Sequence, residues 1–104
     1  MQYDLTSKLS FEENPVIAIK GELFEVNADA ETMLSIMGDF DTKSQVGASL
    51  SAYEKLFSEN ARKKISEFKL SMKDLMTVIQ TAMLLAQGED PDKDVQETAP
   101  RTVL

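Results

Sequence analysis

The stretch PVIAIKGELFEVN, residues 15–27, decides the fold class, because two strand-like runs flank Gly21-Glu22 within it. A glycine at the first position of a two-residue loop suits a type II′ turn, in which that position has a positive φ. The resulting β-hairpin has one apolar face, which must be covered because a lone hairpin is only marginally stable in water. The apolar face carries Ile17, Ile19, Phe24 and Val26, and the predicted pairs are Lys20 with Leu23, Ile19 with Phe24, Ala18 with Glu25, and Ile17 with Val26.

Residues 1–14, before the hairpin, are mixed and weakly patterned. Leu9 and Phe11 alternate with polar neighbours, which is the period of a strand. A short third strand near residues 8–12 is therefore an alternative to an irregular N-terminus.

Helical periodicity begins after the hairpin, with Asn27 or Asp29 as the capping residue. Gly38 is expected to weaken or end this first helix, and residues 38–47 are polar and turn-prone. The apolar residues that recur at helical spacing, and that we expect to face the core, are Ala30, Met33, Leu34 and Met37.

A second helix is predicted over residues 48–57. Residues 58–60, Ser-Glu-Asn, can end it and cap a third helix over residues 61–68. The apolar pattern also permits one continuous helix over residues 48–68, and we favour two pieces. The side of the second helix that we expect to be buried carries Leu50, Tyr53, Leu56 and Phe57.

The last helix occupies most of LSMKDLMTVIQTAMLLAQG, residues 70–88. Ser71 followed by Asp74 resembles a capping box, and Gly88 suits the position just beyond a helix end. The residues after Gly88 are acidic, contain two prolines and lack apolar periodicity, so burial cannot offset the entropy lost by ordering them. The sequence therefore predicts one α+β domain over residues 1–88, a hairpin packed with three to four helices, and a flexible acidic tail over residues 89–104.

This last helix carries more apolar surface than one core-facing stripe needs. Two interpretations stay open: a central helix packed on two sides, or a surface that meets a partner. Methionine is unbranched and polarizable, so it suits adaptable contacts as well as gap filling. At about 100° per residue, the core stripe is Leu75, Ile79, Ala82 and Ala86. The candidate partner-binding residues are Val78, Leu84 and Leu85 outside the stripe, and Met72, Met76 and Met83 at its edge, with more weight on the first three.

Composition argues against several classes of function. Acidic residues outnumber basic ones 18 to 11 in 104 residues, for a net charge of −7, which disfavours nucleic-acid binding. The polar N-terminus is unlike a signal peptide, and no apolar run approaches the roughly 20 residues that span a bilayer. We therefore expect a cytoplasmic protein that binds neither nucleic acid nor membrane.

No catalytic, cofactor-binding or metal-binding residues are predicted, and we expect a protein without enzymatic activity. The chain has no histidine and no cysteine, so it lacks the usual general base and the usual zinc ligands. Asp39 and Asp41 have a spacing seen in metal sites, but GDFDTKSQVG lacks the alternating ligands and closing glutamate of a calcium loop. Open hairpin edges and surplus apolar surface instead predict a homo-oligomer and a protein partner.

The layout of residues 16–92 resembles that of tail assembly chaperones of long-tailed, non-contractile bacteriophages and prophages. The shared features are the hairpin VIAIKGELFEV, the Leu-Phe before a short amphipathic helix in YEKLFSENARKKISEF, and the helix LSMKDLMTVIQTAM followed by a glycine and an acidic tail. The resemblance implies a non-enzymatic protein that coats the tape measure protein, recruits tail-tube subunits and leaves before the tail is complete. Two other classes stay open: a small regulatory or antitoxin-like binder, and a structural head–tail or tail-completion subunit.

Overall fold

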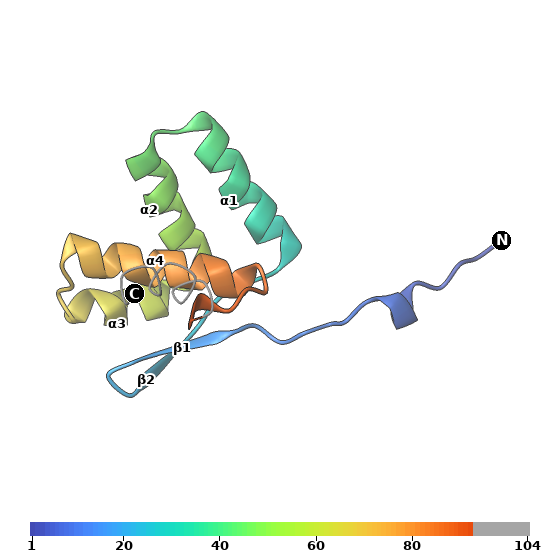
Figure 1. The fold of residues 1–104 in the computed structure, drawn as a ribbon, viewed down its shortest axis with the longest axis horizontal. Helices are drawn as coiled ribbons and strands as arrows, with labels where there is room; N and C mark the ends of the chain where they lie inside the picture. The colour runs from blue at the N-terminus through green and yellow to red at the C-terminus, as the bar shows by residue number, and fades with distance from the viewer. Residues whose placement is uncertain (93–104) are drawn as a thin grey trace, which may run out of the picture.

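A β-hairpin followed by four α-helices makes up the fold in the computed structural model, which describes residues 1–92 (Figure 1). This is the predicted α+β class, and most of the predicted tail, residues 93–104, lies outside the described residues. The elements are the 3₁₀ turn η1 (Thr6–Lys8), strands β1 (Val16–Ile19) and β2 (Glu22–Glu25), and helices α1 (Ala30–Thr42), α2 (Gln45–Leu56), α3 (Glu59–Glu67) and α4 (Met72–Ala86).

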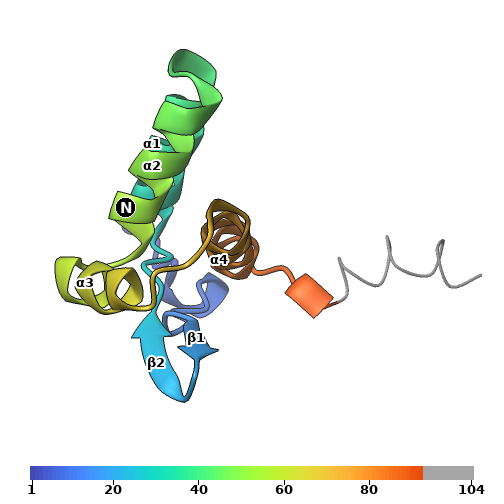
Figure 2. The same cartoon turned by 90° about the vertical axis from the view of Figure 1, so that its left-hand side faces the viewer.

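The helices form two groups. Helices α1 and α2 lie side by side as a helical hairpin that rises from one side of α3 and α4, and the β-hairpin lies on the opposite side (Figures 1 and 2). The core sits where these groups meet, so the outer half of the helical hairpin projects beyond it. The buried apolar residues are Phe24, Val26, Met33, Ile36, Ala48, Ala52, Leu56, Phe57, Ile65, Ile79 and Ala82.

The apolar face of the β-hairpin is as predicted, but the register is not. Phe24 and Val26 are buried, and Ile17 and Ile19 pack against the core. The observed pairs are Val16 with Glu25, Ile17 with Phe24, Ala18 with Leu23, and Ile19 with Glu22. The loop is therefore Lys20-Gly21, with φ values of +49° and +82°, which is the signature of a type I′ turn and not of the predicted type II′ turn. The difference is a slip of two residues, which leaves every side chain on the same face.

Residues 8–12 do not form a third strand, and the described chain has a two-stranded sheet. The Asp4 carboxylate accepts hydrogen bonds from the Thr6 N–H (2.9 Å) and the Thr6 hydroxyl (2.5 Å), and η1 follows directly. Phe11 then has a φ of +52°, which interrupts an extended chain. Local side-chain bonding and this backbone reversal explain why the alternation of Leu9 and Phe11 gives no strand.

Polar side chains cap all four helices, and each accepts a hydrogen bond from the N–H three residues later. The predicted caps Asp29 and Ser71 are confirmed. Ser58 also caps α3, and the extended backbone of Phe57 before it separates α2 from α3, so the two-piece prediction is confirmed. The cap of α2 is Ser44, so that helix begins three residues earlier than predicted.

The end of α4 at Gly88 is also confirmed. Gly88 has a φ of +83°, and its N–H donates to the Leu85 carbonyl oxygen at 3.0 Å. The next N–H, from Glu89, donates to the Leu84 carbonyl oxygen at 2.9 Å. This is a Schellman motif, which satisfies carbonyl groups that a helix end otherwise leaves free.

Two predictions about α1 and α2 are wrong. Helix α1 continues through Gly38 to Thr42, and its buried residues are Met33 and Ile36. Leu34 and Met37, predicted to face the core, are 66% and 55% exposed, and Ala30, predicted likewise, is also exposed. On α2, Leu50 is 56% exposed. The cause is the same in each case, because these residues lie on helix surfaces that no other element of the described chain covers.

Gly38→Ala is expected to raise the free energy of unfolding by about 0.5–1 kcal/mol. Gly38 is exposed in the middle of α1, and an added Cβ would meet no atom within 4 Å. The matched control is Gly88→Ala, which should destabilise the protein because position 88 has a positive φ. Urea unfolding of both variants measures the two changes, and a loss of stability in Gly38→Ala would contradict a regular helix through that position.

Candidate protein-binding surfaces

The outer face of α4 runs the length of the helix and carries mainly thioether, leucine and amide side chains, with the exposed Lys73 as its charged residue. Met72 is 79% exposed, Gln80 and Gln87 are exposed, and Met83 and Leu84 are half-buried. A shallow hollow of about 290 Å³ lies among Gln80, Met83, Leu84 and Gln87. We call this surface the α4 outer face; it comprises Met72, Lys73, Met76, Gln80, Met83, Leu84 and Gln87.

The predicted core stripe of α4 lies next to the outer face, with Met76 and Met83 at the boundary between them. Ile79 and Ala82 are buried, and Leu75 and Ala86 pack against the core. The orientation of the helix is therefore close to that predicted from its sequence.

The six candidate partner-binding residues fall into three groups. Met72 is exposed, whereas Met76, Met83 and Val78 are half-buried and pack against the core. Leu84 and Leu85 are half-buried and lie outside the set of side chains that packs on the core. The structure thus brings Met72, Met76, Met83 and Leu84 onto one face, and places Val78 and Leu85 on other sides of the helix.

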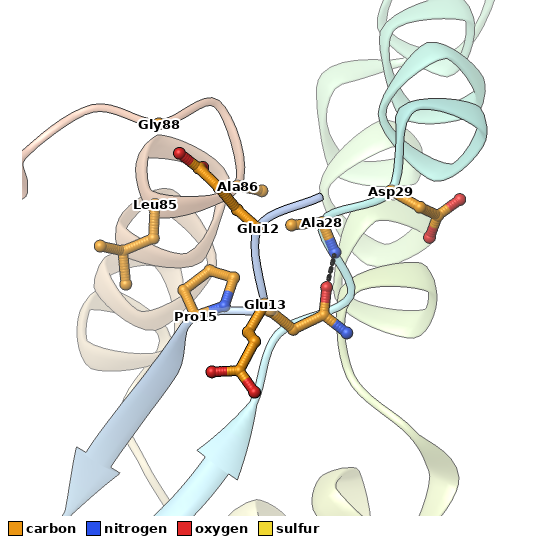
Figure 3. A pocket seen from close by; sticks show the side chains of 9 residues that line it. Glu12, Glu13, Pro15, Ala28, Asp29, Leu85, Ala86 and Gly88 are labelled. Carbon is orange, nitrogen blue, oxygen red and sulfur yellow. Dashed lines mark hydrogen bonds between the residues drawn. The ribbon is translucent and has the colours of Figure 1, made fainter. Parts of the chain in front are cut away.

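Leu85 lies beside the root of the N-terminal segment. It lines a pocket of about 300 Å³ with Pro15, Ala28 and the acidic residues Glu12, Glu13 and Asp29 (Figure 3). The Asn14 side chain holds this region together, because its Oδ1 accepts from the Ala28 N–H at 3.2 Å and its Nδ2 donates to the Glu25 carboxylate at 2.8 Å. Leu85 is therefore closed in by the chain's own residues more than Leu84 is.

A second exposed apolar surface lies on the helical hairpin of α1 and α2, and sequence reasoning missed it. We call it the helical-hairpin surface. Each of these helices carries more apolar residues than one core-facing stripe needs, and this excess indicates an exposed apolar surface. The sequence prediction instead places Leu34, Met37 and Leu50 in the core. Its exposed residues are Leu34, Met37, Phe40, Val46 and Leu50.

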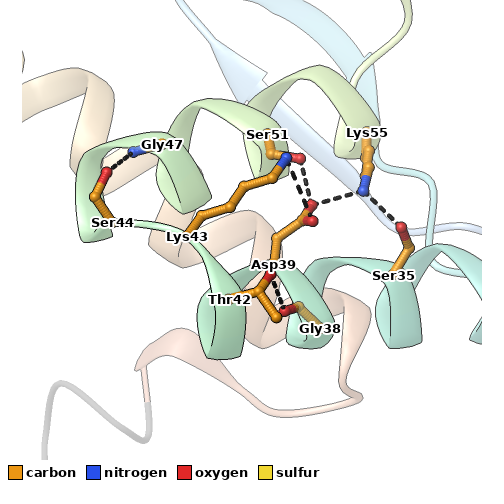
Figure 4. Close-up of polar contacts among 9 residues, drawn as sticks. All are labelled: Ser35, Gly38, Asp39, Thr42, Lys43, Ser44, Gly47, Ser51 and Lys55. Carbon is orange, nitrogen blue, oxygen red and sulfur yellow. Dashed lines mark hydrogen bonds and ion pairs between the residues drawn. The ribbon is translucent and has the colours of Figure 1, made fainter.

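A polar cluster joins α1 to α2 (Figure 4). The Asp39 carboxylate accepts from Lys55 Nζ at 2.6 Å and from the Ser51 hydroxyl, and Lys43 Nζ lies 3.4 Å from its other oxygen. Lys55 Nζ also donates to the Ser35 hydroxyl at 2.5 Å. The hydrogen bonds from Lys55 and Ser51 lower the pKa of Asp39 from 3.8 to about 2. Because every donor comes from this same pair of helices, the cluster holds the helical hairpin together.

Asp39→Asn is expected to lower the thermal unfolding midpoint at pH 7. The pKa of Asp39 is lower in the folded chain than the ordinary 3.8, so its stabilising effect is present above pH 3.8 and disappears as the pH falls through about 2. The difference between wild type and variant should therefore shrink over this interval. Calorimetry across pH measures it, with the exposed Asp41→Asn as control, and a constant difference down to pH 2 would contradict the ion pair.

Among residues 1–92, no three acidic side chains lie close enough together to hold a metal ion. Nor does any helix in this part of the chain have the length and apolar character needed to cross a bilayer.

Comparison of the chain with protein-family models, curated proteins and solved structures finds no match. Function is therefore inferred from the surfaces described above and from the resemblance in layout to tail assembly chaperones.

Proposed function

We propose that this protein is a non-catalytic tail assembly chaperone that binds a phage tape measure protein and tail-tube subunits in the host cytoplasm. The observation that carries the proposal is the distribution of large apolar side chains, of which more are exposed than buried in the described chain. Large exposed apolar patches mark interaction sites, so the exposed side chains of α1, α2 and α4 are candidate contact residues. Such a surface suits a protein whose task is contact with other chains.

The α4 outer face supports a helical partner. The helix is 15 residues long, which is about 22 Å, and its outer face offers mostly thioether and amide side chains, with Lys73 as the charged one. An amphipathic helix can lay its apolar stripe along such a surface, and flexible methionines let one surface accept many different stripes. A tape measure protein is long and largely helical, so successive segments of it would meet this requirement.

The net charge of −7 fits the same role. A chaperone that coats a long apolar helix brings many copies of itself close together, and like charge keeps the loaded complexes from associating further. A net charge near zero would favour precipitation of such a complex.

Co-expression with the tape measure protein encoded near this reading frame tests the proposal. We expect the tape measure protein to move from the insoluble to the soluble fraction and to co-purify with this chain. The helical-hairpin surface and the α4 outer face can be compared by the variants Val46→Ser/Leu50→Ser and Met72→Ser/Leu84→Ser. A tape measure protein that stays insoluble beside well-folded wild-type protein would overturn the proposal.

Mass spectrometry of purified particles separates the proposal from a structural head–tail or tail-completion subunit. A chaperone leaves before assembly ends and should be absent from the particles, whereas a structural subunit should be present in a fixed ratio to the tube protein. A regulatory or antitoxin-like binder would instead bind one neighbouring gene product and leave tail assembly unaffected when deleted.

A further inference from the structure

Residues 1–14 form an arm that extends away from the rest of the chain (Figure 1). Every residue of the arm is exposed. Four of its five large apolar side chains form two pairs, two residues apart within each pair, so each pair would share one side if the arm paired as a strand. They are Tyr3, Leu5, Leu9 and Phe11, with exposed fractions of 67%, 52%, 53% and 73%.

The root of the arm is fixed although its length is uncovered. Asn14 bonds to Ala28 and to Glu25, and Pro15 links the arm directly to β1. The arm therefore leaves the body in a set direction, away from the surfaces of its own chain (Figure 1). No part of the described chain, residues 1–92, buries its apolar side chains, and we look to a second molecule for that cover.

The β-hairpin offers a surface of matching kind. The Val26 N–H donates to the Pro15 carbonyl oxygen at 2.9 Å. In an antiparallel pair every second residue of a strand forms backbone hydrogen bonds with its partner. Val16 and Ala18 are the residues in between, so their backbone N–H and C=O groups point to the open edge of β1. No further strand of the described chain pairs with this edge. On the outer face of the hairpin Val16 and Leu23 are 52% and 73% exposed.

The charges of the two surfaces are complementary. The arm carries three carboxylates, at Asp4, Glu12 and Glu13, and one lysine, Lys8. Two lysines lie at the tip of the β-hairpin: Lys20 lies in the turn, and Lys64 Nζ lies 3.8 Å from the Glu22 carboxylate. An arm that paired with the β1 edge would therefore meet free backbone groups, exposed apolar side chains and lysines.

We propose that the arm of one copy docks on the β1 edge and outer face of the β-hairpin in a second copy. Because the arm runs directly into β1, a two-fold axis beside β1 lets two copies exchange arms and covers both at once. The interface is then closed, and its edges are no longer open to other strands. The dimer needs only this chain, so it stands or falls without the tape measure protein.

Sedimentation equilibrium of the full chain tests the dimer. Wild type should dimerise at micromolar concentration, and Leu9→Ser/Phe11→Ser should raise the dissociation constant at least about tenfold. The thermal midpoint should not change, because both side chains are exposed and lie outside the core of one copy. The matched control is Val46→Ser/Leu50→Ser, an equally exposed apolar pair on α2. A wild-type monomer at all concentrations, or equal weakening by both pairs, would overturn the proposal.

Crosslinking identifies the receiving surface. The chain has no cysteine, so single substitutions report cleanly. Isotopically heavy Leu9→Cys mixed with light Leu23→Cys should give a mixed disulfide under mild oxidation, and Leu9→Cys mixed with Leu50→Cys should give much less. Equal yields from the two mixtures would show that the arm has no preference for the hairpin and would overturn the docking site.

Discussion

Phe24→Asp is expected to unfold the protein at neutral pH, through a loss of more than about 4 kcal/mol in the free energy of unfolding. Phe24 is 2% exposed, and its ring meets the edge of Phe68 at a centroid distance of 6.2 Å. A carboxylate at this position would be buried without a cation to pair it, which costs far more than the lost packing alone. A domain of this size has a total stability of only about 5–15 kcal/mol.

Two further substitutions in the β-hairpin show whether the loss of stability depends on the buried face or occurs at any position of the hairpin. Ile17 pairs with Phe24 and is half-buried, so Ile17→Asp should destabilise strongly but less than Phe24→Asp. Lys20→Asp should change stability by less than about 0.5 kcal/mol, because the side chain is exposed and aspartate tolerates the left-handed backbone of a turn. Urea unfolding followed by circular dichroism measures all three. If Lys20→Asp were the most damaging, the assignment of faces would be wrong.

The β-hairpin shows how far sequence reasoning reaches in this chain. Alternation of apolar residues predicted which side chains face the core, and that side of the hairpin is buried as expected. Alternation cannot choose between registers that differ by two residues, because both keep each side chain on its face. Only the backbone of Lys20 and Gly21, both with positive φ, fixes the register, and lysine gives little indication of that conformation.

The helices show a similar division between local and long-range causes. Caps such as Ser58 and Ser71 were predictable because the serine and the N–H that it binds are three residues apart. Which side of α1 is buried was not, because it depends on where α2 and α4 lie. Asp39 and Lys55 are 16 residues apart, and their ion pair sets the contact between α1 and α2 that leaves Met37 outside.

The candidate surface on α4 was predicted in part. The excess of apolar residues over one stripe was visible from the sequence, and the structure leaves Met72 and Leu84 accessible. The weight given to Val78 is not supported by its position, since Val78 packs against the core. Val78 lies about 120° around the helix axis from both Met72 and Leu84, and the neighbouring elements decide which of these directions is covered.

Met72→Ser/Leu84→Ser is expected to weaken binding of a tape measure segment by about a hundredfold while changing stability by less than about 1 kcal/mol. Both side chains belong to the α4 outer face, and neither is buried. A partner would cover both side chains. Replacing them with serine therefore removes the free energy of burying a large apolar side chain from the complex, but not from the folded monomer. A labelled helical segment of the tape measure protein, titrated with wild type and variant, gives the two dissociation constants.

Val78→Ser is the control that separates binding from folding. Val78 packs against the core, so its loss should lower the free energy of unfolding by about 1–3 kcal/mol and leave binding by the folded fraction nearly unchanged. On the same helix, Val78→Ser should therefore lower stability but not binding, and Met72→Ser/Leu84→Ser should weaken binding but not stability. The contrary result would be that Val78→Ser weakens binding with little loss of stability, while Met72→Ser/Leu84→Ser leaves binding unchanged. The partner would then contact a different side of α4, and Met72 would not take part in binding.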